Sequence, residues 1–441
     1  MTSARRLGLR VVVGLAIAAA GAGWMAVPTG AQQPMDRIAR ERVRLMLEQI
    51  RDEVRRNYYD PTFRGIDLDA HFKRASDRIE QATTLRQGLG IIAQALLDFN
   101  DSHLYFDPPS RTVTVRYGFE VKMVGDRCYV YAVHPKLDAY KQGLRAGDLV
   151  LSLQGFKPTR AELWKMNYFY YVLSPQPALK LVVQSPGAQP RDVSIAADLK
   201  QRQRSVNLFD ELDFDALLRS LDSEGGEHRF KTVGGVTVWK MPAFNLSEDE
   251  VRRTLSRDVK GDALVLDLRG NGGGYFETLE ALVPAFFDHD VRIADLKGRK
   301  ETKPSVGKKR SAAPFAGRLV VVVDSQSGSC AELFARVIQI EHRGTVVGDR
   351  SAGAVMQATY FAGKIGVDSL ILFGAYVTNA DVIMTDGKRL EGVGVVPDEL
   401  ALPEAEDLAA GRDPVLARAI AAAGGTIDAV QAGKLFPRTW R

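Results

Sequence analysis

The sequence predicts an α/β core preceded by a helical unit and a β-rich domain. Three successive residue patterns along the chain indicate this order. Residues 35–100 are charged, with apolar residues at helical spacing, and residues 111–199 contain short β-type runs. From residue 202, compact apolar runs alternate with helix-like stretches. At 441 residues and 45% hydrophobic content, the chain can bury two or three cores.

The first 31 residues are predicted to be an export signal. Arg5, Arg6 and Arg10 precede an apolar run at 11–20, and small residues lead to Ala31. The run is too short and too rich in glycine and alanine for a membrane span to be expected. The alternative is an uncleaved membrane anchor. The adjacent pair of arginines suggests the twin-arginine route. We therefore expect a periplasmic or secreted protein, membrane-associated if the signal is uncleaved.

The charge of the mature chain argues against nucleic acid as a partner. Removing residues 1–31 takes away three arginines and no acidic residue, so the formal charge falls from +5 to +2. Basic clusters remain at 297–300 and 308–310. They lack interleaved aromatic residues and are interrupted by glycine and proline, so we expect a solvated loop there.

Cysteine and histidine usage predicts neither a metal nor another cofactor. Cys128 and Cys330 are far apart in the sequence, and a disulfide between them is not expected. The six histidines form no H-E-x-x-H pattern, and no C-x-x-C pair is present.

The helical unit is expected over residues 35–108. Apolar residues recur between 38 and 50 and again between 89 and 97. The unit ends after Asp101-Ser102-His103, because Pro108-Pro109 prevents further helix.

The β-rich domain is expected over residues 109–200, with strands at 112–115, 119–123, 128–133, 149–153 and 179–183. Tyr117, Gly118 and Phe119 match the carboxylate-binding loop of a PDZ domain, and Gly147-Asp148 and Gly155 fit the same pattern. The segment thus resembles a PDZ domain, which binds a peptide as an added strand and captures its terminal carboxylate. The alternative is a small β-domain that only supports the core.

The core is expected over residues 201–441, beginning with a helical link. Strands are predicted at 236–239, 263–268 and 319–323. Ser329 stands at a turn between the last of these strands and a predicted helix at 330–338. The unpaired N–H groups of a helix start can hold a developing oxyanion, so the position suits acyl transfer. The competing interpretation is a helix N-cap.

A glycine-rich stretch follows the strand at 263–268. Residues 267–274 read Asp-Leu-Arg-Gly-Asn-Gly-Gly-Gly and precede a predicted helix start near Phe276. The three successive glycines permit close backbone approach and could present N–H groups to a carbonyl. A phosphate-cradling loop is the alternative, but its Gly-Lys-Ser/Thr ending and the Rossmann spacing are absent. Together with Ser329, the loop is a candidate oxyanion hole.

Four stretches in order resemble the motifs of the carboxy-terminal processing (tail-specific) and tricorn-core serine peptidases. They lie at 267–274, 327–332, 347–353 and 391–398. With the PDZ-like insert and Asp101-Ser102-His103, the resemblance covers most of the mature chain. It implies a ClpP/crotonase-like core, Ser329 as nucleophile, and the backbone N–H groups of Gly274 and Cys330 as oxyanion donors.

The two branches of these peptidases differ in their catalytic base. In the processing branch a lysine follows the serine in a Gly-Lys ending, but here Gly353 is followed by Ala354. Lys364 is the nearest later lysine and would need a different loop path to reach Ser329. The usual Ser-Lys dyad is therefore not expected.

The tricorn-like branch implies a histidine base instead. Ser102-His103 matches its histidine segment, and Glu391 matches its acidic partner. A neutral imidazole can take the serine proton, and a second polar group can fix its tautomer. The alternatives are a satisfied turn histidine for His103 and a surface carboxylate for Glu391.

These features predict an exported serine endopeptidase that acts on flexible or unfolded polypeptides by a Ser-His mechanism. The PDZ resemblance implies recognition through accessible C-termini. The expected partner is thus a polypeptide substrate, with no nucleic acid and no integral membrane span in the mature chain. One alternative is a non-catalytic carrier of peptides or apolar ligands, because related modules in retinoid carriers bind ligands. Another is an interaction scaffold for envelope assembly.

Overall fold

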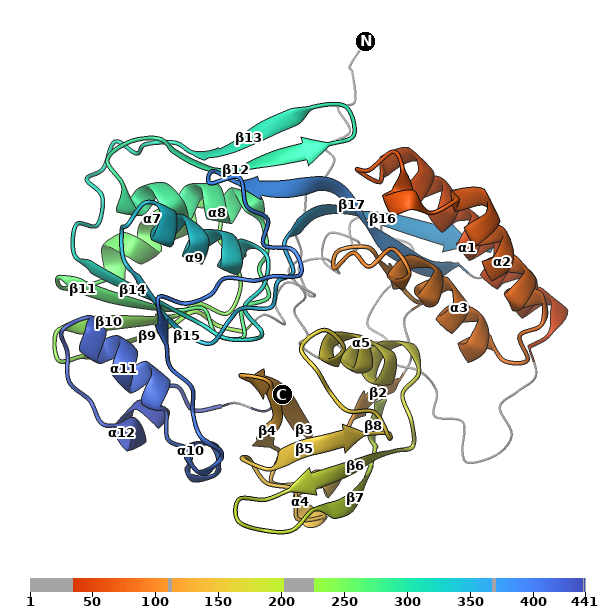
Figure 1. The fold of residues 1–441 in the computed structure, drawn as a ribbon, viewed down its shortest axis with the longest axis horizontal. Helices are drawn as coiled ribbons and strands as arrows, with labels where there is room; N and C mark the ends of the chain where they lie inside the picture. The colour runs from red at the N-terminus through yellow and green to blue at the C-terminus, as the bar shows by residue number, and fades with distance from the viewer. Residues whose placement is uncertain (1–34, 110–112, 202–225, 367–369, 439, 441) are drawn as a thin grey trace.

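The computed structural model describes residues 35–109, 113–201, 226–366, 370–438 and 440 (Figure 1). The expected export signal at 1–31 lies outside these residues, as does most of the expected helical link after residue 201. Within the described part of the chain, no helix combines the length and apolar character needed to cross a membrane.

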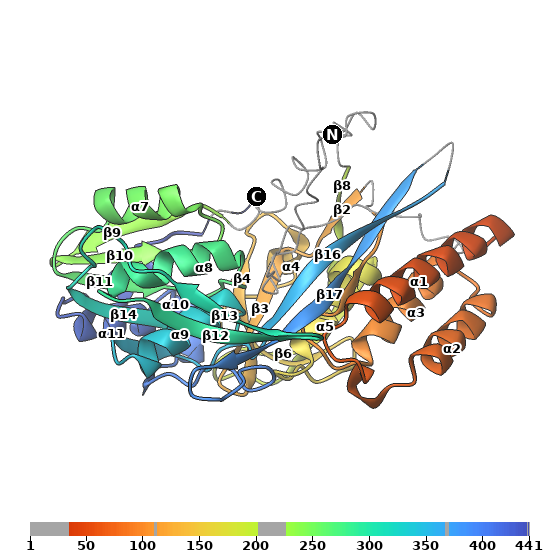
Figure 2. The same ribbon diagram turned by 90° about the horizontal axis from the view of Figure 1, so that it is seen from above.

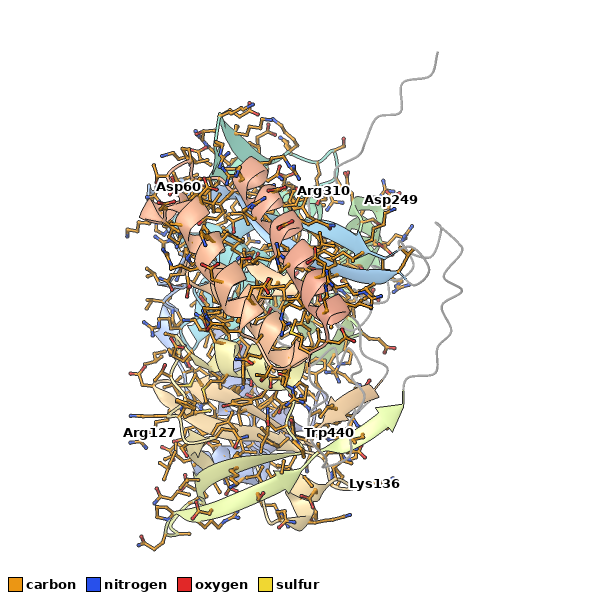
Figure 3. All side chains as sticks on the ribbon, turned by 90° about the vertical axis from the view of Figure 1, so that its right-hand side faces the viewer. Asp60, Arg127, Lys136, Asp249, Arg310 and Trp440 are labelled. Carbon is orange, nitrogen blue, oxygen red and sulfur yellow. The ribbon has the colours of Figure 1, made fainter. Side chains whose placement is uncertain are left out.

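The N-terminal unit contains three helices, α1 (Arg37–Asn57), α2 (Leu68–Glu80) and α3 (Leu85–Leu97). Each begins after a side chain that accepts a backbone N–H of its first turn, namely Asp36, Asp67 and Thr84. In α1, residues at helical spacing form the buried stripe Val43, Met46, Leu47, Ile50 and Val54. Figure 3 shows this unit with Asp60 near its upper end, above the β-rich domain that carries Arg127 and Lys136.

A long hairpin joins the helical unit to the core (Figure 2). Its strands are β16 (Met356–Ile365) and β17 (Ile371–Met384), and β17 also pairs antiparallel with β1 (Tyr105–Asp107) and β12 (Val291–Gly298). The helices bury Ile365, Phe373, Ala375 and Val377 of the hairpin in the same cluster as their own apolar stripes. The helical unit therefore shares a hydrophobic core with strands from the far end of the chain.

The β-rich domain is a five-stranded antiparallel sheet in the order β3-β4-β5-β6-β7. Its strands are β3 (Phe119–Val124), β4 (Arg127–Val133), β5 (Leu149–Leu153), β6 (Ala178–Gln184) and β7 (Arg191–Ala196), with the short helices α4 (Asp138–Lys141), α5 (Leu163–Asn167) and η2 (Tyr168–Leu173). Alternating side chains such as Val130, Leu181 and Ile195 fill its own core. A two-stranded ribbon, β2 (Val113–Arg116) with β8 (Asp198–Gln201), joins the two ends of this domain.

The core domain is built on a six-stranded sheet in the order β18-β15-β14-β11-β10-β9. All neighbours are parallel except the pair of β9 and β10. The strands are β9 (Arg229–Val233), β10 (Val236–Lys240), β11 (Ala263–Asp267), β14 (Arg318–Val323), β15 (Thr345–Gly348) and β18 (Glu399–Leu400). The carboxyl ends of β11 and β14 lead into the glycine-rich loop and the Ser329 turn.

Helices cover both faces of this sheet, as Figure 1 shows. One face carries α7 (Glu248–Arg257), α8 (Phe276–Leu282) and α9 (Cys330–Ile340), and the other α11 (Pro414–Ala422) and α12 (Ala429–Gly433), which α10 (Ala405–Ala410) precedes. Successive residues of β14 serve the two faces in turn: Val321 packs with the first helix set and Val322 with the second. Strands buried on both sides explain the uninterrupted apolar runs in the sequence.

One of the two basic clusters is a loop only in part. The basic stretch at 297–300 starts within β12, whose last residues are Lys297 and Gly298, and continues into the turn before β13 (Thr302–Gly307). Lys297 and Lys300 are exposed, as expected for a solvated segment. Arg299 is only partly exposed, because it donates to the carbonyl of Arg55 at 2.7 Å. Pairing with β17 orders β12, and this long-range partner is not visible in the local composition.

Candidate active site

Ser329 occupies the tight turn between β14 and α9, with φ 51° and ψ −120°. A non-glycine residue in this region is strained, and such strain concentrates at functional turns. The residue is fully buried, and its Oγ has no hydrogen-bond partner among the described residues. Ser329 thus stands at the N-cap position of α9 without using its hydroxyl as a cap.

The glycine-rich loop lies against the Ser329 turn. The N–H of Gly328 donates to the carbonyl of Asn271 at 2.9 Å, and the Cys330 thiol approaches the Gly274 carbonyl at 3.4 Å. Gly274 has φ +143°, and a Cβ there would lie 2.2 Å from the carbonyl oxygen of Phe244. Only glycine fits this position. The two expected oxyanion donors, Gly274 and Cys330, are therefore neighbours in space.

Cys330 itself is not a candidate nucleophile. Burial raises the pKa of its thiol above the usual range, so the reactive thiolate is absent at neutral pH. Cys128 is also buried and free, so the two cysteines form no disulfide.

Ser102, His103 and Glu391 form one hydrogen-bonded group, although Glu391 is 289 positions from Ser102. The Ser102 hydroxyl donates to Glu391 Oε2 at 2.8 Å, and Ser102 Oγ lies 2.8 Å from His103 Nδ1. The Ser102 N–H donates to Glu391 Oε1 at 3.0 Å. Because the single Ser102 hydroxyl proton is directed to the carboxylate, the histidine is the donor in the other contact. This assigns the proton to Nδ1 and leaves Nε2 as an acceptor.

The free nitrogen of His103 is buried and has no described partner. Burial lowers the pKa of His103 to about 3, so the ring is neutral at physiological pH. For Glu391, burial and the neighbouring charge of Asp101 raise the pKa to about 7. When Glu391 is ionised, its carboxylate accepts hydrogen bonds from the Ser102 N–H, the Ser102 hydroxyl and the Val355 N–H. Both carboxylate oxygens then have a donor.

A short chain of hydrogen bonds connects this group with the Ser329 turn. The Ser329 N–H donates to the carbonyl of Ala354 at 2.9 Å, and the next residue, Val355, donates its N–H to Glu391 Oε2 at 2.8 Å. Segments from three distant parts of the sequence therefore meet around the dipeptide at 354–355.

Glu332 is a central residue of this region whose role the sequence did not reveal. Its fully buried carboxylate accepts from the Ser351 hydroxyl at 2.5 Å and from the N–H groups of Gly353, Ala354 and Ser329 at 2.7, 2.9 and 3.1 Å. Burial raises the pKa of Glu332 to about 7. Its place three positions after Ser329 was the available signal, but burial of a carboxylate depends on tertiary contacts.

Lys364 lies far along β16 from the Ser329 turn. Ala354 precedes the strand, and Lys364 lies eight positions after Met356, which corresponds to about 26 Å of extended chain. The Lys364 side chain is exposed. Its position does not favour a role as base.

The residues expected to bind a peptide carboxylate stand at the start of β3. Tyr117 and Phe119 are buried, and Gly118 has φ +75°. The Tyr117 hydroxyl donates to the carbonyl of Gln176 at 2.8 Å and accepts from its N–H at 2.7 Å. These contacts fix the loop on the β-rich domain.

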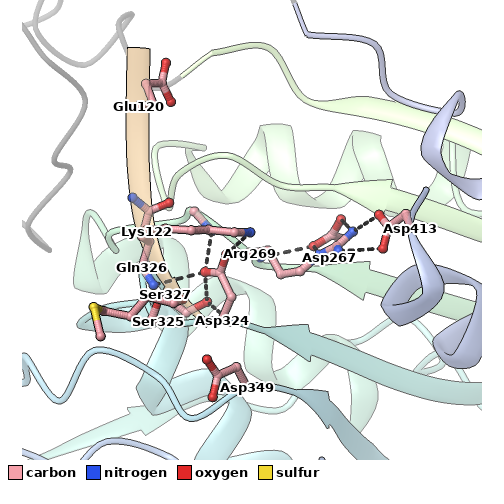
Figure 4. A network of polar contacts seen from close by, with 12 residues as sticks. Glu120, Lys122, Asp267, Arg269, Asp324, Ser325, Gln326, Ser327, Asp349 and Asp413 are labelled. Atoms are coloured by element: carbon pink, nitrogen blue, oxygen red, sulfur yellow. Dashed lines mark hydrogen bonds and ion pairs between the residues drawn. The ribbon is translucent and has the colours of Figure 1, made fainter. Parts of the chain in front are cut away.

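The β-rich domain contacts the Ser329 turn through a buried ion pair, shown in Figure 4. Lys122 Nζ of β3 lies 3.3 Å from Asp324 Oδ2, and both side chains are nearly inaccessible. Asp324 Oδ1 accepts the N–H of Gly270 at 2.9 Å, so it also holds the glycine-rich loop. Burial disfavours ionised Asp324, but the positive charge of Lys122 and other contacts leave its pKa below the usual value. One carboxylate therefore joins the domain to both loops of the site.

The comparisons with known peptidases indicate a serine-type peptidase. Residues 233–401 match the model of peptidase family S41. The resemblance to processing and tricorn-type peptidases is therefore confirmed.

Curated relatives are named as peptidases of the processing and tricorn types. The chain is 24% identical over 367 residues to the chloroplastic C-terminal processing peptidase of Tetradesmus obliquus, covering 80% of this chain and 75% of the relative. It is 31% identical over 173 residues to the putative tricorn protease homolog 2 of Streptomyces coelicolor. That match covers 39% of this chain and 14% of the relative, so it concerns only one part of a much longer protein.

Solved structures share the fold at low sequence identity. Mature CPAF matches with a TM-score of 0.60 and 13% identity, over 84% of this chain and 94% of CPAF. The photosystem II D1 C-terminal processing protease matches with a TM-score of 0.50 and 18% identity, over 88% and 98% of the two chains.

Proposed function

We propose that the protein is an exported serine endopeptidase that cleaves flexible or unfolded polypeptides by a Ser-His mechanism. Its parts would be an export signal at 1–31, a helical unit at 35–108, a PDZ-like domain at 109–200 and a ClpP/crotonase-like core at 201–441. Substrate C-termini would enter through the loop of Tyr117, Gly118 and Phe119.

One observation carries the mechanism: Ser329 Oγ and His103 Nε2 are both buried and unpaired. Buried polar atoms are nearly always hydrogen-bonded, so an unpaired one needs an explanation, and a catalytic role is one such explanation. The hydrogen bonds that pass through the dipeptide at 354–355 bring the two segments to the same region. We therefore assign Ser329 as nucleophile and His103 as its base.

In the reaction, His103 Nε2 takes the proton of Ser329 Oγ as the oxygen attacks the substrate carbonyl. The backbone N–H groups of Gly274 and Cys330 stabilise the oxyanion, and the protonated nitrogen then gives its proton to the leaving amine. The Ser102 hydroxyl bridges Glu391 and His103 Nδ1 by hydrogen bonds, so the negative carboxylate stabilises the imidazolium. Hydrolysis of the acyl-enzyme repeats these transfers with water.

The test is labelling with a fluorophosphonate, which reacts with activated serines. We expect labelling of the wild type at Ser329, its loss in Ser329→Ala and His103→Ala, and normal labelling in Lys364→Ala. Cleavage of an unfolded polypeptide should follow the same pattern, while its compactly folded form is cut slowly. If the folded wild type is neither labelled nor active, and binds a peptide or an apolar ligand unchanged in Ser329→Ala, the chain is a carrier rather than a peptidase.

A further inference from the structure

Asp101 is a buried carboxylate that the proposed reaction does not use. Its side chain is inaccessible to solvent, and it precedes Ser102 and His103 directly. Removing a charge from water is costly unless several donors compensate it. The groups that face Asp101 therefore indicate what the carboxylate is for.

Those groups come from three segments. The Tyr58 hydroxyl, at the end of α1, donates to Asp101 Oδ2 at 2.9 Å, and the Thr378 hydroxyl of β17 donates to Oδ1 at 2.7 Å. The backbone N–H of His103 donates to the same Oδ1 at 3.0 Å. Arg64 Nη2 lies 3.7 Å from Oδ2, and the Arg64 guanidinium also donates to the Phe99 carbonyl at 3.3 Å.

We propose that Asp101 is a positioning residue for His103, and that Tyr58, Arg64 and Thr378 make the helical unit and the hairpin part of the catalytic apparatus. This inference rests on the proposed function. The Asp101 carboxylate fixes the peptide that carries the base, while the Ser102 hydroxyl fixes the ring. Asn100, just before it, has φ 51°, so the turn needs such an anchor to hold one conformation.

Asp101 also acts on Glu391 through its charge. The negative Asp101 raises the pKa of Glu391, in the same direction as burial. The other charged or titratable groups around the two carboxylates are Tyr58, Tyr59 and Arg64 from the helical unit and His103 from the loop. Burial raises the pKa of Asp101 itself, the charge of Arg64 opposes this shift, and the ring of His103 is neutral.

Asp101→Asn is nearly isosteric and separates this role from a purely structural one. Its amide oxygen can still accept from His103 and Thr378, but the charge is lost. We expect the plateau rate constant of fluorophosphonate labelling to fall about tenfold and the midpoint of its acidic limb to move down by about one pH unit. Tyr58→Phe and Thr378→Val, which each delete one hydroxyl, should lower the plateau less.

The matched control is Asp77→Asn, which removes a carboxylate from the same unit at an exposed site paired with Lys73. It should label like the wild type at every pH. An Asp101→Asn variant that keeps the wild-type plateau and acidic midpoint would overturn the proposal, as would an equal effect of Asp77→Asn. Thermal unfolding followed by circular dichroism verifies that each variant is folded.

A second measurement keeps this inference separate from the proposed activity. In protein labelled with ¹⁵N-histidine, the ring signals of His103, assigned with His103→Gln, report its tautomer without any reaction. We expect the Nδ1–H tautomer in the wild type and a mixture in Asp101→Asn. Identical ring signals in both proteins contradict the positioning role, whereas absent labelling of the wild type contradicts only the peptidase activity.

Discussion

The N–H of Ser329 donates to the carbonyl of Ala354 at 2.9 Å, so the residue that follows Gly353 in place of the dyad lysine still touches the candidate nucleophile. It does so through its backbone and supplies no base. The same short segment continues into Val355, which donates to Glu391. In the processing branch, the dyad lysine would stand in this loop. Here the loop joins the Ser329 turn to Glu391, the carboxylate of the proposed Ser-His arrangement.

Ser102→Ala should lower kcat about a hundredfold with little change in KM, because the histidine loses the link that fixes its tautomer and connects it to Glu391. Steady-state cleavage of an unfolded polypeptide measures both constants. The control is Ser256→Ala, which alters an exposed hydroxyl on α7 and should retain full activity. Equal kcat values for Ser102→Ala and the wild type would remove Ser102 from the mechanism.

Gly274→Ala should reduce kcat by about a hundredfold or more, because the new methyl group meets the Phe244 carbonyl at 2.2 Å and must displace an oxyanion donor. Gly270→Ala is the matched control in the same loop. It also has positive φ, at +73°, but a Cβ there meets nothing within 4 Å, so it should cost about 1 kcal/mol of stability and little activity. Similar losses in both variants would show that backbone strain, rather than the donor position, matters.

Glu332→Gln should destabilise the protein by about 2 kcal/mol and slow fluorophosphonate labelling of Ser329. An amide NH₂ in place of one oxygen would face N–H donors of the loop at 353–354. Urea unfolding at pH 8 measures the stability. Glu341→Gln, at the solvent-exposed end of α9, should be neutral in both assays. A Glu332→Gln variant with unchanged stability and labelling would mean that the carboxylate does not hold this loop.

Lys122→Met should destabilise the protein by about 3 kcal/mol and lower kcat, because it leaves Asp324 buried without its ion partner. Adding Asp324→Asn should restore part of the stability, since the uncompensated charge is then gone. Lys136→Met, on the exposed surface of the same domain, is the control. If the single and double variants are equally stable, the two residues are not coupled.

Acid should destabilise the fold partly through His103. Burial lowers the pKa of this histidine from 6.5 to about 3, so between these values the unfolded chain binds the proton more readily than the folded protein. Stability from this group therefore falls as pH drops from 6.5 toward 3. The gap in unfolding free energy between His103→Gln and the wild type should shift in favour of the variant over this range. His289→Gln, which removes a histidine from an exposed site, is the control variant.

The apolar runs predicted most of the core. Strands buried on both faces need uninterrupted apolar residues, and β10, β11 and β14 begin and end within a residue or so of the runs at 236–239, 263–268 and 319–323. The hairpin of β12 and β13 was missed because charged residues interrupt its apolar residues and because it is ordered by pairing with β17. Strand pairing across such distances leaves no local pattern.

The site was less accessible to sequence reasoning than the fold. The positive-φ turn at Ser329 and the close approach of Gly274 to Phe244 follow from a strand-turn-helix pattern and a glycine run. The meeting of Ser102 with Glu391 came only from the resemblance to known peptidases. The anchoring contacts of Glu332 and Asp101 could not be predicted from the sequence, because a buried carboxylate is recognised only when its donors are placed around it.

The bond between Ser102 and Glu391 spans 289 positions, which has a kinetic consequence. Contacts of such separation form late, since the intervening chain must first be ordered. A chain that is still unfolded, or only partly synthesised, therefore carries Ser329 without the base that we propose for it. Under the proposed function, such latency needs no inhibitory segment. The protein could cleave other unfolded chains only after it had itself folded.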